Sequence, residues 1–450
     1  MNHNFSEDTI CSIITGGGKS AIAVIRISGN KSIEITDSIF SKDIKEVNSH
    51  TIHHGNIKDI NLIDEVLVTI FKENKSFTGE ESVEISCHGS IFIQEKIINI
   101  LIKKGCRLAK EGEFTMRAFK NGKLDLLQAE AIADLINSEN PQTHKNALNQ
   151  LRGKLSNRLQ SLRNKLIEFS SLIELELDFS EENVEFAKRE ELKKLLEYLS
   201  KNITELISSF KLGNAIKRGI PIAILGSPNV GKSTLLNTLL EEDKAIVSEI
   251  PGTTRDLIED TITINNLLFR FIDTAGIRES KDQIEKIGIK KSLEIASKSE
   301  VILFVIDPTM NLKQQIKEYK EIQKLYNKKT MIISNKNDLK KSIKLNENYI
   351  SISAKNRSGI EILKTKLVNF INKQHNTDSE YIINNVRHIE ELHLTLKEIE
   401  NILSGIEQNI SIDLLSVNIR QALFHLGMIT GEITTDDLLD NIFSKFCIGK

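Results

Sequence analysis

The sequence predicts a multidomain α/β protein: an N-terminal α+β domain, then a P-loop domain with a mostly parallel sheet inserted into an α-helical bundle. Three observations lead to this fold class. The chain has 450 residues, which is too long for a single hydrophobic core. Strand-like and helix-like segments alternate from about residue 218 to 373, which is typical of a parallel sheet covered on both faces. Long helical patterns stand before and after that region.

Residues 1–120 are predicted to form the α+β domain. Runs rich in β-branched residues at 21–29, 65–71 and 82–87 indicate strands, and apolar residues recur at helical spacing in 31–40 and 91–104. The segment contains no nucleotide-binding fingerprint. We therefore place any nucleotide chemistry elsewhere in the chain.

Two separate segments, 121–215 and 376–450, are predicted to form the helical bundle, with the P-loop domain inserted at 216–375. Both segments consist of long helix-forming stretches with apolar stripes, and from about residue 124 to 211 only Pro141 and Gly153 interrupt the pattern. Because the same helical sequence pattern stands on the two sides of the insertion, we expect the two segments to form one bundle. The expected helices are 126–136, 148–175, 192–210, 386–403, 414–426 and 437–446.

Composition restricts the functional classes. The formal net charge is -2, so any nucleic acid must be met by a local basic patch. The four cysteines form no C-x-x-C pair, which excludes a zinc site of that kind and favours a reducing, cytoplasmic location. The polar N-terminus does not resemble a signal peptide, and no apolar run approaches the roughly 20 residues of a membrane span.

The P-loop domain is organised around Gly226-Ser-Pro-Asn-Val-Gly-Lys-Ser-Thr234, a full G-x-x-x-x-G-K-S/T motif. An apolar run, 221–225, leads into it, and a helical pattern follows. Backbone N–H groups of such a turn face a polyphosphate. We expect Lys232 to reach the outer phosphates and Ser233 to hold Mg²⁺.

Four further elements follow in a fixed order and indicate guanine specificity. The first element is the loop Gly252-Thr-Thr-Arg-Asp256, which offers a threonine, and the second is Asp273-Thr-Ala-Gly276, which follows a predicted strand. The third is Asn335-Lys-Asn-Asp338 at the end of another predicted strand, and the fourth is Ser353-Ala-Lys355, which would complete the base pocket. The Asp338 carboxylate accepts two hydrogen bonds from guanine, whereas adenine would leave it unpaired. The predicted GTP-binding residues are Asn229, Val230, Gly231, Lys232, Ser233, Thr234, Ser248, Glu249, Ile250, Pro251, Gly252, Thr253, Thr254, Asp273, Thr274, Ala275, Gly276, Asn335, Lys336, Asp338, Ser353, Ala354 and Lys355.

One departure affects the hydrolysis mechanism. Many small GTPases place glutamine directly after D-x-x-G, but this chain has Ile277, whose side chain makes no hydrogen bond. Hydrolysis must recruit another group, such as Asp282 or Glu285, or a charge from outside. From the residues alone, either carboxylate is more simply explained as part of a solvated helix face.

The whole chain resembles one family, the tRNA uridine-5-carboxymethylaminomethyl modification GTPases (MnmE/TrmE). Besides the GTPase motifs, the resemblance rests on family-specific segments. These are Val24-Ile-Arg-Ile-Ser-Gly29, Ser76-Phe-Thr-Gly-Glu80 with His88-Gly89, Gly112-Glu-Phe-Thr-Met-Arg-Ala-Phe119, the segment 123–136, and Phe446-Cys-Ile-Gly-Lys450.

The resemblance implies a folate-binding N-terminal domain that also forms a homodimer. It implies work with an FAD-dependent partner protein of the MnmG/GidA type, in a heterotetramer or larger complex, on the wobble uridine (position 34) of certain tRNAs. The one-carbon unit would come from 5-formyl or 5,10-methylene tetrahydrofolate. The folate site would fall on Arg26, Glu84, Lys123 and Lys450, and Cys447 would be the reactive thiol. Without the family, Arg26 and Lys123 would be interpreted as surface cations and Cys447 as a buried apolar residue.

The resemblance also accounts for the missing glutamine. Family members bind K⁺ where an arginine finger would put its charge, and G domains dimerise across the nucleotide. The K⁺ ligands would be Asn229, Ser248, Ile250 (through its carbonyl) and Thr253, with Ser233 and Thr254 on Mg²⁺ and Glu285 orienting the water. A fixed charge at the β/γ bridge stabilises the transition state.

Two alternatives use the same G domain. A ribosome-assembly GTPase would carry a basic RNA-binding appendage, and the sequence shows no sign of one. A membrane-remodelling GTPase would need a lipid contact, and none is evident. We therefore expect a hydrolase acting on GTP that takes part in tRNA modification, with no membrane partner.

Overall fold

The computed structural model describes residues 8–138, 140–178, 188–241, 260–265, 267–272, 294, 296–326, 330–339, 349–374 and 383–450. The chain divides into two compact units. The first comprises Met1–Asn137, Ala147–Leu196 and Lys397–Lys450, and the second comprises Ser138–Asn146 and Glu197–Leu396. Each unit has its own six-stranded sheet and its own buried apolar cluster.

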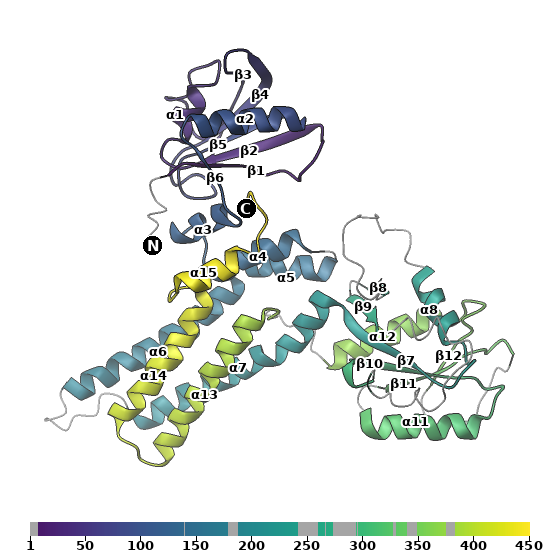
Figure 1. The fold of residues 1–450 in the computed structure, drawn as a ribbon. Coiled ribbons are helices and arrows are strands. Elements are labelled where there is room, and N and C mark those ends of the chain that lie inside the picture. Colours follow the sequence, from purple (N-terminus) through teal and green to yellow (C-terminus); the bar gives the residue numbers. More distant parts are fainter. Residues whose placement is uncertain are drawn as a thin grey trace. The chain divides into compact units, whose positions relative to one another are not determined.

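The sheet of the first unit has the strand order β3-β4-β5-β2-β1-β6. Neighbouring strands are antiparallel except β1 and β6, which are parallel. Helix α2 lies along one face (Figure 1), and its Ile97 and Leu101 share the core with strand residues such as Ile25 and Ile85. The elements are β1 (Ile10–Ile13), β2 (Ile22–Ser28), α1 (Ser32–Asp37), β3 (Thr51–Lys58), β4 (Leu62–Phe71), β5 (Ser82–His88), α2 (Ile91–Lys103) and β6 (Arg107–Leu108).

The register of this sheet places two predicted site residues side by side. Strands β2 and β5 pair so that Arg26 lies directly opposite Glu84. Their neighbours Ile25, Ile27, Val83 and Ile85 point into the core. Because successive side chains alternate between the two faces of a strand, Arg26 and Glu84 share the face that points away from the core.

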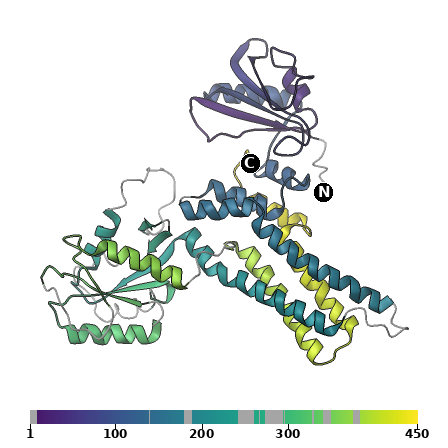
Figure 2. The same ribbon diagram turned by 180° about the vertical axis from the view of Figure 1, so that it is seen from behind.

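Long helices make up the other part of the first unit and extend into the second. In both ribbon views α6 and α14 lie side by side although they are far apart in sequence (Figure 1, Figure 2). Helix α4 begins with a capping box, because Asp125 accepts a hydrogen bond from the Gln128 N–H and the Gln128 side chain accepts one from the Asp125 N–H. The helices are α3 (Glu113–Lys120), α4 (Leu126–Ile136), α5 (Pro141–Leu151), α6 (Lys154–Asp178), α7 (Arg189–Arg218), α13 (Val386–Glu407), α14 (Ile412–Thr430) and α15 (Asp436–Phe443).

One predicted helix is wrong. The pattern over 148–175 predicted a single helix, but α5 ends at Leu151 and α6 begins at Lys154. Gly153 between them has a φ of 75°. This left-handed conformation is available to glycine at little cost and ends a helix. The apolar periodicity of the sequence therefore continues across an interruption of the helix.

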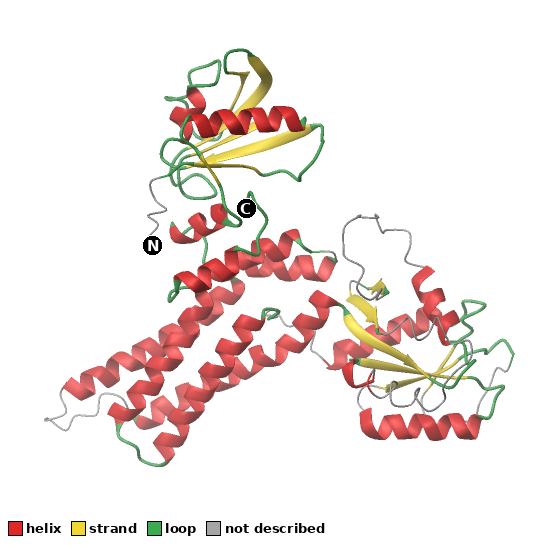
Figure 3. Ribbon diagram, in the orientation of Figure 1, coloured by secondary structure: helices red, strands yellow, loops and turns green. Residues whose placement is uncertain are grey.

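The second unit holds a sheet with the order β12-β11-β10-β7-β9-β8, in which only β8 and β9 are antiparallel. Helices flank this sheet (Figure 3). One apolar cluster joins α8 and α12 to one face, and another joins α11 to the opposite face. The elements are β7 (Ile220–Leu225), α8 (Lys232–Glu241), β8 (Thr261–Ile264), β9 (Leu267–Phe271), β10 (Val301–Ile306), α11 (Leu312–Tyr326), β11 (Thr330–Ser334), β12 (Tyr349–Ser351) and α12 (Ile360–Gln374).

The predicted fold class is confirmed: an α+β N-terminal part, a helical part, and a P-loop domain with a mostly parallel sheet. The boundaries 1–120, 121–215, 216–375 and 376–450 stay a prediction. In the described part of the chain, no helix combines the length and the apolar character needed to cross a bilayer.

Candidate functional site

The phosphate loop follows β7 and can be built only with glycine at two positions. Gly226 has a φ of 142°, and a Cβ added there would lie 2.2 Å from the Val305 carbonyl oxygen. Gly231 has a φ of 93°, and its added Cβ would lie 2.4 Å from Asn335 Nδ2. The loop therefore packs directly on neighbouring backbone and side-chain atoms, which fixes the direction of its N–H groups.

Lys232 occupies the first position of α8, at the end of this loop. Its ammonium donates hydrogen bonds to the carbonyl oxygens of Gly226 (2.8 Å) and Ser227 (2.9 Å). Burial lowers the pKa of Lys232, and Glu318 opposes that change. The ammonium group is thus held inside the loop that is predicted to bind the phosphates.

Asn335 joins three of the predicted GTP-binding loops. Its Nδ2 donates to the Val230 carbonyl (3.0 Å), and its Oδ1 accepts a hydrogen bond from the Ala354 N–H (2.9 Å). The side chain is 2% exposed. Strands β7, β11 and β12 are parallel neighbours of β10 or of each other, so the loops that follow them meet at one edge of the sheet.

The loop of residues 335–338, the predicted base-recognition loop, is held by contacts of Lys336 and Asp338. Ser353 Oγ donates to Asp338 Oδ1 at 2.6 Å, which orients the carboxylate that is predicted to read guanine. Lys336 Nζ donates to the Asn229 carbonyl (2.9 Å) and forms an ion pair with Asp307 (2.6 Å). Burial alone would raise the pKa of Asp307, but the hydrogen bonds from Lys336 and Thr309 hold it below the usual value.

About half of the predicted GTP-binding residues are described, and the structure brings them together. Those described are Asn229, Val230, Gly231, Lys232, Ser233, Thr234, Asn335, Lys336, Asp338, Ser353, Ala354 and Lys355. Predicted residues outside the described part of the chain are Ser248, Glu249, Ile250, Pro251, Gly252, Thr253, Thr254, Asp273, Thr274, Ala275, Gly276 and Glu285.

The described residues offer only part of each predicted cation site. Ser233 lies in the first turn of α8, where its hydroxyl suits Mg²⁺ beside a bound phosphate. Asn229 has a φ of 64° in the phosphate loop, an unusual conformation that asparagine tolerates. Among the described residues, no group of three or more His, Cys, Asp or Glu side chains could hold a metal ion.

A second candidate site lies on the sheet of the first unit. Arg26 donates to Glu84 Oε1 through both Nε (3.0 Å) and Nη2 (2.8 Å). The guanidinium carbon lies 5.3 Å from the ring centroid of Phe77 and 5.5 Å from that of Phe114. Both distances are within cation–π range. Arg26 is therefore a fixed, half-buried cation rather than a loose surface charge.

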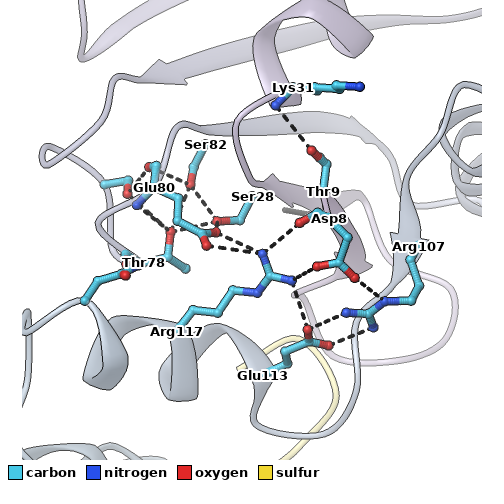
Figure 4. Close-up of polar contacts among 12 residues, drawn as sticks. Asp8, Thr9, Ser28, Lys31, Thr78, Glu80, Ser82, Arg107, Glu113 and Arg117 are labelled. Carbon is cyan, nitrogen blue, oxygen red and sulfur yellow. Dashed lines mark hydrogen bonds and ion pairs between the residues drawn. The ribbon is translucent and has the colours of Figure 1, made fainter. Parts of the chain in front are cut away.

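A buried polar network connects the two segments that carry these rings (Figure 4). Arg117 of α3 donates to Glu80 (3.2 Å) in the loop that holds Phe77, and to Glu113 (3.1 Å) next to Phe114. Arg107 also donates to both oxygens of Glu113, at 2.6 and 3.0 Å. Burial alone would raise the pKa of Glu113, but the two arginines and the Lys110 N–H hold it below its usual value. The network thus fixes α3 against the 76–80 loop.

The C-terminal peptide also contacts this region. The Phe114 N–H donates to the Lys450 carbonyl oxygen at 3.2 Å, and Ile448 forms a β-bridge with Glu111. A Cβ on Gly449, whose φ is 97°, would lie 2.5 Å from the Ile13 carbonyl oxygen. Lys450 is therefore brought to the residue whose ring flanks Arg26.

Cys447 and Lys123 complete the predicted set. Cys447 is exposed, which contradicts the alternative interpretation as a buried apolar residue, whereas Cys11, Cys87 and Cys106 are buried. Lys123 Nζ donates to the Asn74 carbonyl oxygen at 3.0 Å. A Cβ added to Gly79 would lie 3.2 Å from Lys123 Cγ. Lys123 thus packs on the loop that also carries Phe77.

Three residues that make contacts at these sites were not predicted from the sequence. Asp307 directly follows the buried strand β10, and an acidic residue at the carboxyl end of a central strand was the available signal. Phe77 and Phe114 lie inside segments that carried the family resemblance, but nothing in their spacing indicated that they meet at Arg26.

Comparison with known families accounts for nearly the whole chain. The model described as "GTP-binding protein TrmE N-terminus" matches residues 9–123, and the "MnmE helical domain" model matches residues 126–447, well over half of the chain. The chain belongs to the MnmE family.

Curated MnmE relatives match over the full length. Proteins named tRNA modification GTPase MnmE are 49% identical in Flavobacterium psychrophilum (99% of each chain), 49% in Cytophaga hutchinsonii (98% of each) and 47% in Bacteroides thetaiotaomicron (99% of this chain, 100% of that one). Among solved structures, the G domain of the T. maritima FeoB iron transporter is similar over 34% of this chain and 98% of that one, at 25% identity and a TM-score of 0.26.

Proposed function

We propose that this chain is a GTP hydrolase that takes part in tRNA modification. The observation that carries the proposal is the joined set of loops at the sheet edge, in which Asn335 connects the phosphate loop to the base-recognition loop. The evidence that tRNA is the substrate comes from the full-length relatives, which are named tRNA modification GTPase MnmE. The same relatives favour this function over the ribosome-assembly alternative.

In the proposed hydrolysis, the loop backbone and Lys232 bind the phosphates, and Asp338 selects guanine. Ser233 and Thr254 would hold Mg²⁺, and Asn229, Ser248, Ile250 and Thr253 would hold K⁺. These cations supply fixed positive charge next to the transferred phosphoryl group. Glu285 would orient the attacking water, because Ile277 makes no side-chain hydrogen bond.

In the proposed tRNA chemistry, the Arg26 region binds a tetrahydrofolate derivative, 5-formyl or 5,10-methylene. Glu84, held in place by Arg26, suits the donor edge of the pterin, and Lys123 and Lys450 suit the carboxylates of the glutamate tail. The described hydrogen bonds of Glu84 all go to Oε1, which leaves Oε2 for this purpose. The folate supplies the one-carbon unit that becomes part of the carboxymethylaminomethyl group.

The proposal also includes the partner molecules of the protein and its location in the cell. The N-terminal domain would form a homodimer, an FAD-dependent protein of the MnmG/GidA type would join it, and the wobble uridine of certain tRNAs would be the acceptor. Cys447 would be the reactive thiol, and its exposure supports that role. Four free cysteines suit a cytoplasmic protein.

The nucleotide mechanism is tested by GTP turnover of the full chain in potassium and in sodium buffer. We expect turnover to fall by roughly 10² in sodium, the size of effect seen when one charge-stabilising donor is removed. Asn229→Ala should lower the potassium rate and leave the sodium rate nearly unchanged. Equal rates in the two buffers would reject the potassium mechanism.

The tRNA chemistry is tested separately by mass spectrometry of wobble nucleosides. Cells carrying Cys447→Ser or Arg26→Gln in place of the parent chain should lack the modified nucleoside, whereas the purified variants should still hydrolyse GTP. Retention of the modified nucleoside in both strains would show that this region is not the site of the one-carbon chemistry.

A further inference from the structure

The outward face of α11 carries a row of four lysines, which we call the lysine stripe: Lys313, Lys317, Lys320 and Lys324. All four are exposed. Their spacings of four, three and four residues place them within an arc of about 60° at 3.6 residues per turn. At 1.5 Å per residue the stripe is about 16 Å long. It is therefore a straight line of positive charges about 5 Å apart.

The opposite face of α11 is fixed to the sheet. Tyr319 and Gln315 are 4% and 3% exposed, and Tyr319 belongs to the apolar cluster that includes Phe304 of β10. Gln315 donates to the Asp307 carbonyl oxygen at 2.9 Å. Packing and hydrogen bonding thus set the rotation of the helix and direct the lysine stripe away from the sheet.

The positive charges of the stripe outnumber the negative charges beside it, because Glu321 is the one acidic residue on the same surface of the helix. Within the described residues, none of the four lysines has a salt bridge, although Glu321 stands four residues after Lys317. Ile316 and Glu321 lie beside the four lysines on the same open face of the helix. In a chain with a formal net charge of -2, this is a local basic patch of the kind that the composition requires for contact with nucleic acid.

We propose that the lysine stripe binds the phosphate backbone of tRNA. The inference rests on the proposed function in tRNA modification. Repeated charges of one sign along a line suit a polyanion whose phosphates also repeat at short intervals. A protein partner fits less well, because protein interfaces centre on apolar and aromatic anchors and are depleted in lysine, and Ile316 is the single apolar residue among those that form this open surface.

The chemistry of the contact limits what it can do. Lysine ammonium groups meet phosphates as point charges, so the stripe positions the tRNA without reading its sequence. Choice of the tRNA would then depend on other residues. Binding through the stripe should weaken strongly with salt, since each neutralised phosphate releases condensed counterions.

The test is tRNA binding by the full chain in which all four stripe lysines are changed to glutamine (K313Q, K317Q, K320Q and K324Q). Fluorescence anisotropy of a labelled, unmodified tRNA would be measured at fixed potassium while sodium chloride rises from about 50 to 200 mM. We expect the Kd at low salt to rise at least about 10-fold and the slope of log K against log salt to flatten by about 3. Lysine-to-arginine changes at the same positions should retain binding.

A matched control removes the same charge from scattered exposed lysines, Lys42, Lys58, Lys194 and Lys397. This control should change the Kd by less than about twofold, because those four lysines do not form a row that the phosphates of one tRNA strand could follow. Binding of a fluorescent GTP analogue to both variants checks that the G domain is folded.

A stripe variant with the Kd and salt slope of the control would overturn the proposal. So would normal tRNA binding combined with lost binding to an acidic protein partner, since the stripe would then be a protein contact. If the parent chain hydrolyses GTP but binds no tRNA at low salt, the proposed function fails as well, and that result is distinct from a failure of the stripe alone.

Discussion

At the scale of single residues, Glu113 shows how a buried charge can be both costly and required. It lies one turn before Arg117 in α3, and the side chains are 0% and 2% exposed. Burying two charges costs several kcal/mol each, and their attraction with added hydrogen bonds offsets that cost. Removing one partner leaves the other charged and buried. Neither side chain of the pair can therefore be replaced by a neutral one without destabilising the fold.

Glu113→Gln should lower the free energy of unfolding by about 3 kcal/mol at neutral pH, because it leaves Arg117 and Arg107 without this carboxylate. The pKa of Glu113 is held below its usual value of 4.5 in the folded chain. The stabilisation is thus present above pH 4.5 and is lost as the pH falls through the folded-state pKa. Urea unfolding at neutral and acidic pH checks this.

The control is Glu321→Gln on the exposed face of α11, which should change stability by less than about 0.5 kcal/mol. A loss for Glu113→Gln that stays equal at both pH values would contradict the ion-pair explanation, because it would point to shape rather than charge.

The thiols give a second prediction at this scale. Cys447 is exposed, whereas Cys11, Cys87 and Cys106 are buried, and burial raises the pKa of Cys87 to about 11. Thiolates react and buried thiols do not. Native protein should therefore show one fast thiol per chain with a disulfide reagent at mildly alkaline pH, and Cys447→Ser should show none. Two or more fast thiols in the native parent would contradict the described burial.

At the scale of elements, glycine ends α5 where apolar periodicity predicted one helix. Gly153 has a φ of 75°, and a Cβ there would meet nothing closer than 3.4 Å. Space is available, so the cost of a side chain comes from the backbone. Gly153→Ala should lower the free energy of unfolding by about 1–2 kcal/mol, the cost of a left-handed residue. Thermal or urea unfolding measures it.

Gly16→Ala is the matched control, because Gly16 has no atom within 4 Å of an added Cβ and no positive φ. It should change stability by less than about 0.5 kcal/mol. Equal effects of the two changes would mean that the break before α6 does not depend on glycine.

The elements also show what sequence reasoning can reach. Strands β2 and β5 were predicted because β-branched residues alternate along them, and the phosphate loop because its chemistry is local to one motif. Strand β3, with its two histidines, and helix α3 were missed. Helix α3 buries Glu113 and Arg117, which an apolar pattern cannot reveal. The contacts of Arg26 with Phe77 and Phe114 depend on distant segments, so spacing gave no signal.

At the scale of the whole molecule, the two compact units have separate apolar cores. Chains of this kind commonly unfold in more than one step. A ligand that binds one unit stabilises it by about 2.7 kcal/mol at 100 times its Kd. We expect scanning calorimetry to show more than one transition, and a non-hydrolysable GTP analogue to raise the temperature of one of them.

An ATP analogue at the same concentration is the control and should leave every transition unchanged, because adenine offers the Asp338 carboxylate no matching pair of donors. A single transition that moves as a whole with GTP would contradict independent unfolding of the two units. A response to ATP equal to that of GTP would contradict guanine selection.

The double contact of Asn335 has a consequence for protein engineering. Because one amide side chain joins Val230 to Ala354, the phosphate cradle and the base pocket cannot be exchanged as separate cassettes. Grafting only the base-recognition loop of an adenine-binding relative would remove the hydrogen bond from Asn335 to the phosphate loop. A chimera with altered purine preference would have to carry all three loops from a single donor.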